Sequence, residues 1–521
     1  MDSFSNRDKD VFLITCEKMI DRGALMSRYS RTRELDIRTL WDKEFAQVPD
    51  RAEKFYERVF LEYGDESVAE LATAQVGIQN VSNVLSKIIE ESRIGLSYLE
   101  KSSRYVSYRE KRNGKYLFID PKRAGIPSKF QERYEEFNNR IFELYGEIFT
   151  GVSDYIHEKN PFESTRFFLP NGKEVKLGER EGEEDVLKKA YESSVRSRAL
   201  DETRLILPAS TLTNIGMSGN ARAFSHLLER LKTSGLKEAG ELYSELMAEL
   251  KLVFPKLIEN VENPHGLENL DYLTKLKNYA PLEGEFVASI PRQKIELLSY
   301  DNDEVALDKI LASYHFERTD GDYETVYRHI GGLTKQRKVE MLDKILSLRT
   351  NRRNKLDRSF EHVHYTFQVN TNFGAFRDLQ RHRSLTIQRK KLSTAHGYDI
   401  PPIISVIEGL SKRYVEAVTE SNELYKQVSS IDPKSAQYFV LFAHIQPVLI
   451  TLNLRELVYL TELRSTPQAH FDLRQISRDM VRLVRQANPS LSRAFIFLNE
   501  KEEELGRLSA ELRKEIKLKN Q

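Results

Sequence analysis

The sequence predicts a helix-rich α+β protein built from two tandem domains of similar plan. The chain has 521 residues, and a single hydrophobic core stops growing at about 250–300 residues, so at least two domains are expected. The helical spacing of apolar residues dominates the sequence, and short β-favouring runs recur in each half. An internal similarity of long period is the third observation, and it predicts that the two domains are copies of one another.

Two stretches of equal length carry this similarity: "SVAELATAQVGIQNVSNVLSKIIEES" at 67–92 and "RSFEHVHYTFQVNTNFGAFRDLQRHR" at 358–383. Each opens with a short helix-like stretch that contains an acidic residue, Glu70 or Glu361. A β-favouring run and an amphipathic helix then follow in the same order. A shift of 291 positions superposes the two stretches, as expected of a tandem duplication.

The boundary between the copies is expected at 263–293, which contains proline and glycine and lacks sustained periodicity. The alternating stretch "KIELLSYD" at 294–301 then predicts a new opening strand. A second echo supports the division, because 217–231 and 451–464 each predict a helix that opens near an asparagine. The predicted parts are a first domain at 1–262, a linker at 263–293, a second domain at 294–492 and a charged C-terminal helix at 493–521.

Charge and composition restrict the class of protein. Lys and Arg number 80 against 79 Asp and Glu, so general electrostatic attachment to nucleic acid or membrane is not expected. The single cysteine, Cys16, excludes an internal disulfide and a cysteine-built metal site. No run approaches about 18 apolar residues, and the N-terminus does not resemble a signal peptide. A soluble, cytoplasmic protein is expected.

A local basic cluster, "LQRHRSLTIQRKKLS" at 379–393, departs from this overall balance. On a helix predicted over 374–383, Arg377 and Arg381 share one face. Like charges at that spacing are tolerated when they are solvated, or when a phosphate neutralises them through bidentate hydrogen bonds. A solvated face is the alternative interpretation, whereas RNA binding is disfavoured because aromatic residues are not interleaved with the cluster.

A second set of polar residues lies in "YLEKSSRYVSY" at 98–108. Glu100, Ser102 and Arg104 occupy alternate positions, so in an extended segment all three point the same way. Serine and arginine donate to phosphate oxygens and glutamate accepts from hydroxyl or ring N–H groups, which suits a phosphorylated, polyhydroxylated ligand. The alternative is an exposed strand edge with ordinary polar residues.

Other catalytic motifs are absent from the sequence. It contains no GxxxxGK[ST] phosphate loop, no GxGxxG after a strand, no HExxH and no GxSxG. His362 and His364 have the spacing of a strand metal pair, but further ligands are not nearby, so no metal is expected.

These residues resemble the flavin-dependent thymidylate synthases. That family is marked by S-x-x-E-H, a strand, a helix, the triplet RHR and then, after seven intervening residues, a serine within E-x-S-x-R-Y. The second half is similar in "EHVHYTFQV", "RHR" and "NLRELVYLTELRSTPQAHFDLR" (453–474). The first half is similar in "ESVAEL" (66–71), "EKSSRYVSY" and "ETRLILPASTLTNIGMSGNARAFSHLL" (202–228). The resemblance spans about 25–255 and 294–490 and implies a duplicated, divergent member.

Departures from the family pattern divide between the halves. The first half has Glu90-Glu91-Ser92 at the RHR position, and nine residues rather than seven separate either triplet from Ser102 or Ser393. Gln437 stands at the position equivalent to Arg204, and Leu231 at that equivalent to Arg464, with Arg230 adjacent. Each half has therefore lost what the other keeps, which predicts one composite site per chain.

The resemblance implies reductive methylation of dUMP to dTMP, with FAD as cofactor and with NADPH and methylenetetrahydrofolate as co-substrates. It implies a homodimer, in which two duplicated chains reproduce a four-domain assembly. A non-catalytic flavin- or nucleotide-binding relative, and a flavin enzyme acting on another pyrimidine nucleotide, remain alternatives. The residues implied to bind dUMP are Glu100, Ser102, Arg104 and Arg204; those implied to face the flavin and the pyrimidine are Ser67, Glu70, Glu361, Arg381, His382, Arg383, Asn453 and Arg464, with Arg381 and Arg464 as the catalytic pair.

Overall fold

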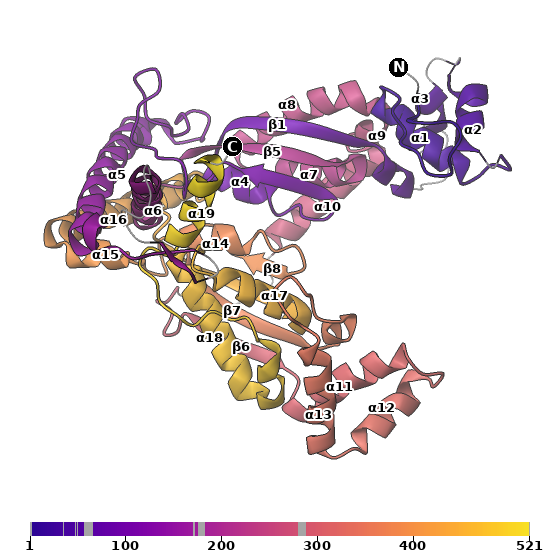
Figure 1. Ribbon diagram of the computed structural model, residues 1–521. Coiled ribbons are helices and arrows are strands. Elements are labelled where there is room, and N and C mark those ends of the chain that lie inside the picture. Colours follow the sequence, from indigo (N-terminus) through magenta and orange to yellow (C-terminus); the bar gives the residue numbers. More distant parts are fainter. Residues whose placement is uncertain are drawn as a thin grey trace.

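The computed structural model describes residues 3–34, 36–46, 48, 51–56, 66–169, 172–175, 183–279 and 288–519. Helices dominate these residues, and each half of the chain has its own small antiparallel sheet (Figure 1). The predicted α+β class with two tandem domains is confirmed. In the described residues no helix is both long and apolar enough to cross a membrane.

The sheet of the first half has the strand order β1-β5-β2. Two of its strands lead directly into helices, β1 into α4 and β5 into α7. The side chains of Ser82 and Asn220 accept backbone N–H groups of the first turns of α4 and α7, as N-cap residues do. The bounds are β1 (Thr73–Ser82), β2 (Leu96–Glu100), β5 (Leu212–Asn220), α4 (Asn83–Ile89) and α7 (Ala221–Lys232).

The sheet of the second half repeats this plan with one strand added, in the order β6-β7-β9-β8. Asn372 and Asn453 cap the helices that follow β7 and β9. These strand-to-helix turns correspond to the two in the first half, so the repeat in the sequence is a repeat of structure. The bounds are β6 (Ile295–Tyr300), β7 (His364–Asn372), β8 (Thr386–Arg389), β9 (Ile445–Asn453), α14 (Phe373–Leu379) and α17 (Leu454–Arg464).

The two halves extend as two arms from a helical junction (Figure 1). The junction contains α5 (Gln131–Lys159), α6 (Glu183–Thr203), α15 (Pro402–Val406) and α16 (Glu408–Ser429), which pack on one another. Backbone hydrogen bonds join the halves there, from Ala209 N to the Val440 carbonyl at 2.7 Å and from Phe442 N to the Leu207 carbonyl at 2.8 Å. Since these peptide groups are buried with the core around them, the two halves share one interior.

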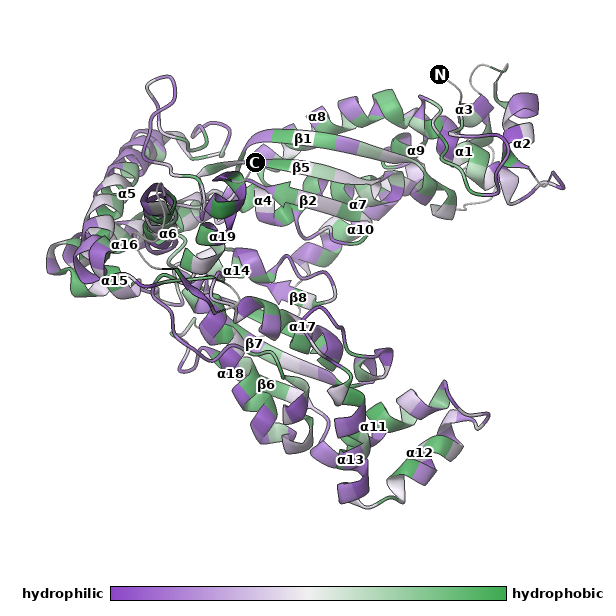
Figure 2. Ribbon diagram, in the orientation of Figure 1, coloured by the Kyte–Doolittle hydropathy of each residue, from purple (hydrophilic) through white to green (hydrophobic). Residues whose placement is uncertain are grey.

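Helices also cover the outer ends of both arms (Figure 1). Figure 2 shows hydrophobic and hydrophilic residues along the same helices, as expected when one face packs on a sheet and the other meets solvent. The remaining bounds are α1 (Met19–Tyr29), α2 (Ile37–Glu44), α3 (Arg51–Tyr56), α8 (Lys237–Val253), α9 (Pro255–Glu259), α10 (Pro264–Asn278), α11 (Asp303–Phe316), α12 (Tyr323–Gly331), α13 (Lys335–Ser347), α18 (Phe471–Ala487), α19 (Leu508–Lys519), β3 (Phe167–Phe168) and β4 (Glu174–Val175).

Two predicted helix limits differ from the structure. The helix expected over 374–383 ends at Leu379, so the RHR triplet lies in the turn that follows α14. The C-terminal helix expected from 493 begins at Leu508 as α19. In both segments the helical spacing of residues in the sequence extends beyond the residues whose backbones form helical hydrogen bonds. The ends of a helix are the part that sequence spacing defines least well.

The segment expected to be a linker, 263–293, begins with the helix α10. Pro264 suggested a break, but it occupies the first helical turn, where a proline's missing N–H costs nothing. Asn263 caps that helix by accepting the N–H of Gly266 at 2.7 Å. Residues 280–287 of the predicted linker lie outside the described residues.

Candidate functional site

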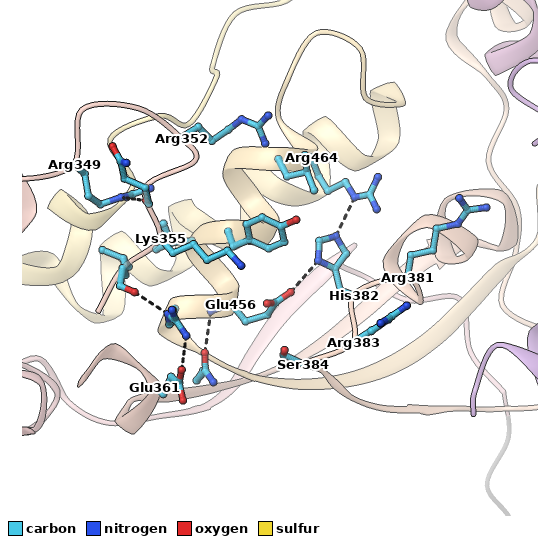
Figure 3. A pocket seen from close by; sticks show the side chains of 17 residues that line it. Arg349, Arg352, Lys355, Glu361, Arg381, His382, Arg383, Ser384, Glu456 and Arg464 are labelled. Atoms are coloured by element: carbon cyan, nitrogen blue, oxygen red, sulfur yellow. Dashed lines mark hydrogen bonds and ion pairs between the residues drawn. The ribbon is translucent and has the colours of Figure 1, made fainter. Parts of the chain in front are cut away.

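A cavity of about 620 Å³ lies in the second half (Figure 3). Pockets that hold small molecules and cofactors measure about 300–1,000 Å³, so the cavity has the size of a ligand site. The turn after α14, the helix α17 and the loop that follows α13 all contribute to its wall. The lining residues are Arg349, Arg352, Asn354, Lys355, Leu356, Glu361, Arg381, His382, Arg383, Ser384, Asn453, Arg455, Glu456, Val458, Tyr459, Leu463 and Arg464.

The wall of this cavity is strongly basic, with seven arginines and lysines against two glutamates. Arg455 is neutralised by Glu361 at 2.6 Å, and Arg349 by Glu462, outside the wall, at 2.7 Å. Arg352, Lys355 and Arg383 have no carboxylate within ion-pair distance among the residues that the structure describes. These three cations are therefore available to an anionic ligand. A carboxylate partner, if present, would compete with that ligand for the same N–H donors.

His382 joins two other residues of the wall into a chain of hydrogen bonds (Figure 3). Its Nδ1 lies 2.9 Å from the Glu456 carboxylate, and its Nε2 accepts from Arg464 Nε at 3.0 Å. Burial lowers the pKa of His382, although the hydrogen bond to Glu456 opposes this effect. The imidazole is therefore neutral at pH 7, with its proton on Nδ1 and its Nε2 lone pair facing Arg464. Arg464 also donates to the Asp378 carbonyl at 3.0 Å, so its guanidinium is held in place.

The other half of the chain fixes the RHR turn. Arg93 donates to the backbone carbonyls of His382 and Leu385, and Arg383 donates to Ser97 Oγ at 2.9 Å. Within the second half, Asn453 lines the cavity at the start of α17. Its Oδ1 caps that helix by accepting from Glu456 N at 2.9 Å. The geometry of the triplet therefore depends on contacts between the halves as well as on its own sequence.

The residues predicted to hold dUMP are placed differently, in a buried cluster between the two halves. Arg104 makes two hydrogen bonds to the Asp201 carboxylate, at 2.7 and 2.8 Å. Arg204 lies 3.5 Å from the Asp378 carboxylate and donates to the Gly374 carbonyl at 3.1 Å. Each of these two arginines is paired with a carboxylate of the chain itself, and neither lines the 620 Å³ cavity.

Glu100 lies in the same buried cluster. Its carboxylate is 2.9 Å from Arg377 and 3.6 Å from Arg381, and it also pairs with Lys87. Although burial works in the opposite direction, these cations hold the pKa of Glu100 well below its usual range. Arg381 thus lines the cavity and reaches the first half through one ion pair, which is where the two predicted sets of residues meet.

The remaining predicted residues do not join the cavity wall. The extended run expected at 98–108 stops at Glu100, where β2 ends, and Ser102 lies in the turn beyond, accepting from Arg104 N at 3.3 Å. Ser67 and Glu70 lie in a short 3-10 helix of the first arm, and Glu70 pairs with Arg222 at 2.8 Å.

The first half has no comparable cluster of free cations at the position equivalent to the RHR turn. Glu91 stands where the second half has His382, and it pairs with Arg230 at 2.9 Å and with Arg389. A smaller cavity of about 350 Å³ lies beside these residues. The carboxylate of Glu91 neutralises the surrounding arginines, so the described part of this half offers a weaker anion site.

Two further buried carboxyl groups lie near the junction. Burial raises the pKa of Glu202 to about 7, even though Arg198 lies beside it and Ile403 N donates to it. Burial and the nearby Asp399 raise the pKa of Asp472 to about 6, while Asn372 donates to its carboxylate at 2.6 Å. Both groups titrate near neutral pH.

Sequence reasoning did not identify the loop that supplies Arg349, Arg352 and Lys355. Its sequence, "RTNRRNKL" at 349–356, concentrates cations next to asparagines, which are typical of turns. The criterion that singled out the basic cluster at 379–393 applies here too. Glu456 and Tyr459 were also missed, because nothing local separates them from other polar residues of an amphipathic helix.

Comparison with known proteins agrees with the repeat. The profile of the family described as "Thymidylate synthase complementing protein" matches residues 17–180, 179–256 and 296–490. The UPF0159 protein Ta1429 of Thermoplasma acidophilum is 45% identical over 503 residues, covering 96% of this chain and 99% of that protein. A flavin-dependent thymidylate synthase of Geobacter sulfurreducens is 26% identical over 161 residues, covering 29% of this chain and 67% of that protein.

One solved structure is a UMP/dUMP methylase, PolB, of Streptomyces cacaoi, bound with 5-Br dUMP. It shares 14% identity with a TM-score of 0.34, covering 41% of this chain and 98% of that chain. The profile matches nearly the whole chain, once in the second half and in two consecutive segments of the first. The chain therefore belongs to the thymidylate synthase complementing protein family, and it carries the family's domain twice.

Proposed function

We propose that the cavity of the second half binds FAD and that the chain methylates a uracil nucleotide, converting dUMP to dTMP with methylenetetrahydrofolate and NADPH. The observation that carries this proposal is a cavity of about 620 Å³ that includes the RHR turn and three cations for which the described residues supply no carboxylate partner. Membership of the family supports the choice of a flavin and of a uracil nucleotide.

The residues of the wall fit a dinucleotide cofactor. A diphosphate carries negative charge that Arg383, Arg352 and Lys355 can neutralise through charge-assisted hydrogen bonds. Tyr459 lines the cavity with 41% of its surface exposed, which offers a flat face to an aromatic ring. When bound, FAD supplies the redox chemistry, while the protein contributes binding, orientation and electrostatics.

Arg464 is the residue best placed to stabilise negative charge on a uracil ring. Its guanidinium is held by His382 and by the Asp378 carbonyl, so little reorganisation is needed when charge develops nearby. Burial lowers the pKa of Arg464 without bringing it near neutrality, because arginine stays protonated in proteins. Arg381, at the mouth of the cavity, is the second cation assigned to this role.

A second candidate function is supported by the buried cluster between the halves. Arg104 and Arg204, which the family pattern assigns to dUMP, are already neutralised by Asp201 and Asp378. If a nucleotide phosphate does not displace these carboxylates, the chain binds a flavin or nucleotide without making thymidylate. The homodimer and the cytoplasmic location are likewise proposals that rest on the family pattern.

The deciding experiment is an absorbance spectrum of the purified protein with FAD, followed by titration with dUMP and a dTMP assay with both co-substrates. A flavin spectrum that shifts with dUMP, together with dTMP formation, supports the first function. Flavin binding without a shift or turnover supports the second. Absence of both flavin uptake and dUMP binding by the wild-type protein would remove both.

A further inference from the structure

We infer that the loop after α13, residues 349–356, is a binding subsite for the adenosine diphosphate end of a dinucleotide. This inference rests on the proposed ligand cavity but adds a part of it that the family pattern does not contain. The loop faces the RHR turn across the cavity, and Figure 3 shows Arg352 and Lys355 on the side opposite Arg383.

The loop is a built structure. Asn354 Oδ1 accepts from the backbone N–H groups of Thr350 and Asn351, both at 3.0 Å, and from Thr350 Oγ1 at 3.1 Å. Arg349 donates to the Asn354 carbonyl at 2.8 Å. One asparagine side chain thus closes the turn at three points, as asparagine does in tight loops.

Arg349 anchors this turn to the rest of the second half. Its side chain is buried, pairs with the Glu462 carboxylate of α17 at 2.7 Å and donates to the Ala494 carbonyl at 3.0 Å. The cation at the base of the loop is therefore structural. Because the base is fixed, the two cations at its tip are held beside the cavity, which lowers the entropy lost when an anion binds.

The tip carries the charge that an anion requires. Arg352 is partly buried and Lys355 is exposed, and both line the cavity without a carboxylate partner among the described residues. An arginine presents a planar pair of donors to one phosphate, and a lysine adds a mobile point charge for the next. Two cations on one loop supply positive charge for both phosphates of a diphosphate.

Tyr459 completes the subsite. Its exposed ring lies between the loop and the RHR turn, with Lys355 Nζ 5.8 Å from the ring centroid and the His382 ring 5.9 Å away. A flat, exposed aromatic ring beside phosphate-binding cations is the arrangement on which a purine base stacks. Adenosine diphosphate supplies both the ring and the two phosphates, and both FAD and NADPH contain this moiety.

The test uses ADP as the probe on the full-length protein, measured by calorimetry at low salt. Wild-type protein is expected to bind ADP, and Arg352→Gln and Lys355→Gln are each expected to weaken binding about tenfold, as the loss of a charge-assisted hydrogen bond does. Arg353→Gln is the matched control, because Arg353 is exposed in the same loop but does not line the cavity. Its affinity for ADP should stay within about twofold of wild type.

FMN, which lacks the adenosine, should bind equally well to the wild type and to both variants. Tighter binding of 2′-phosphoadenosine 5′-diphosphate than of ADP would identify NADPH rather than FAD as the source of the adenosine moiety, and would still support the subsite. Failure of wild-type protein to bind ADP, or equal affinity in all three loop variants, would overturn it. ADP binding that depends on the loop without any flavin uptake would keep the subsite and remove the proposed flavin function.

Discussion

Two arginine-rich regions of the molecule differ in where their negative charge comes from. In the buried cluster between the halves, Asp201 and Asp378 neutralise Arg104 and Arg204. In the cavity of the second half, Arg352, Lys355 and Arg383 have no such partner among the described residues. The comparison teaches that arginines become structural when the chain supplies its own anion, and keep their charge available to a ligand when it does not.

The same contrast separates the two copies of the domain. At equivalent positions, the second half places His382, whose neutral ring accepts from Arg464, and the first half places Glu91, whose carboxylate pairs with Arg230. A neutral ring leaves the surrounding cations positive, whereas a carboxylate cancels one of them. The difference at this one position therefore lowers the positive charge that the first half offers to an anion.

The largest expected effect comes from breaking the buried cluster. Arg104→Ala leaves the buried Asp201 with Arg507, 3.5 Å away, as its remaining described ion-pair partner. Removing one partner of a buried ion pair costs about 3–5 kcal/mol, so the free energy of unfolding should fall by that amount in urea denaturation. Arg383→Ala, at the exposed rim of the cavity, is the control and should cost less than about 1 kcal/mol. Equal losses in the two variants would contradict the comparison.

Stability should also depend on pH through Glu202. Its pKa of about 7 in the folded protein exceeds the ordinary value of 4.5, so the folded state binds more protons than the unfolded state between these values. The stability contribution is therefore full below pH 4.5 and is lost as the pH rises through about 7. The loss attributable to this group is about 3 kcal/mol.

Glu202→Gln, which removes the titration, should flatten that part of the profile. The measurement is urea denaturation at a series of pH values for both proteins. Asp472, whose pKa is about 6, remains in the variant and accounts for a residual slope between its ordinary value and pH 6. Superimposable profiles for the variant and the wild type would show that Glu202 titrates normally.

Removing the negative charge of Asp201 should allow the buried cluster to bind an external anion. Asp201→Asn frees the guanidinium of Arg104 while keeping the side-chain volume, so phosphate should stabilise this variant more than the wild type. At ten times its dissociation constant, a bound anion adds about 1.4 kcal/mol to the free energy of unfolding. The measurement is the thermal midpoint with and without phosphate, with chloride of equal ionic strength as the control. Equal phosphate effects in both proteins would mean that the cluster stays closed without its aspartate.

The smallest effect is expected in the hydrogen-bond chain of the cavity. Glu456→Gln weakens the hold on His382 Nδ1 and so loosens Arg464, at a cost of about 1 kcal/mol in ligand binding. The measurement is the affinity for FAD at several pH values, since a protonated His382 repels Arg464. Glu416→Gln, at an exposed position of α16 that does not line the cavity, serves as the control. A shift of the pH profile in Glu456→Gln alone would identify the chain as a positioning device.

The sequence anticipated much of the fold from local patterns. Alternation in "YTFQVN" and the following amphipathic run predicted β7 and α14, and the same order in the first half predicted β1 and α4. The helix α10 was missed, because Pro264 reads as a break unless its position in the first turn is known. The predicted strands and helices are set by residues within a few positions of one another, and hydrophobic periodicity is informative over that range.

Part of the candidate site was predictable from the sequence and part was not. Arg381, His382, Arg383, Glu361, Asn453 and Arg464 were predicted by the sequence pattern, and all six line one cavity. That Arg104 and Arg204 are neutralised was not predictable, because their partners lie far along the chain, Asp201 by 97 residues in the case of Arg104. The loop at 349–356 became part of the site only through its position across the cavity.

By itself, then, the sequence determined that this protein is a duplicated α+β chain of one family, and which residue types could bind an anion. The tertiary structure decided which of those cations are already paired with a carboxylate of the chain. The physical reason is that the charge of a binding site is a sum over groups brought together in space, and a buried carboxylate a few ångströms away cancels an arginine whatever its distance in sequence.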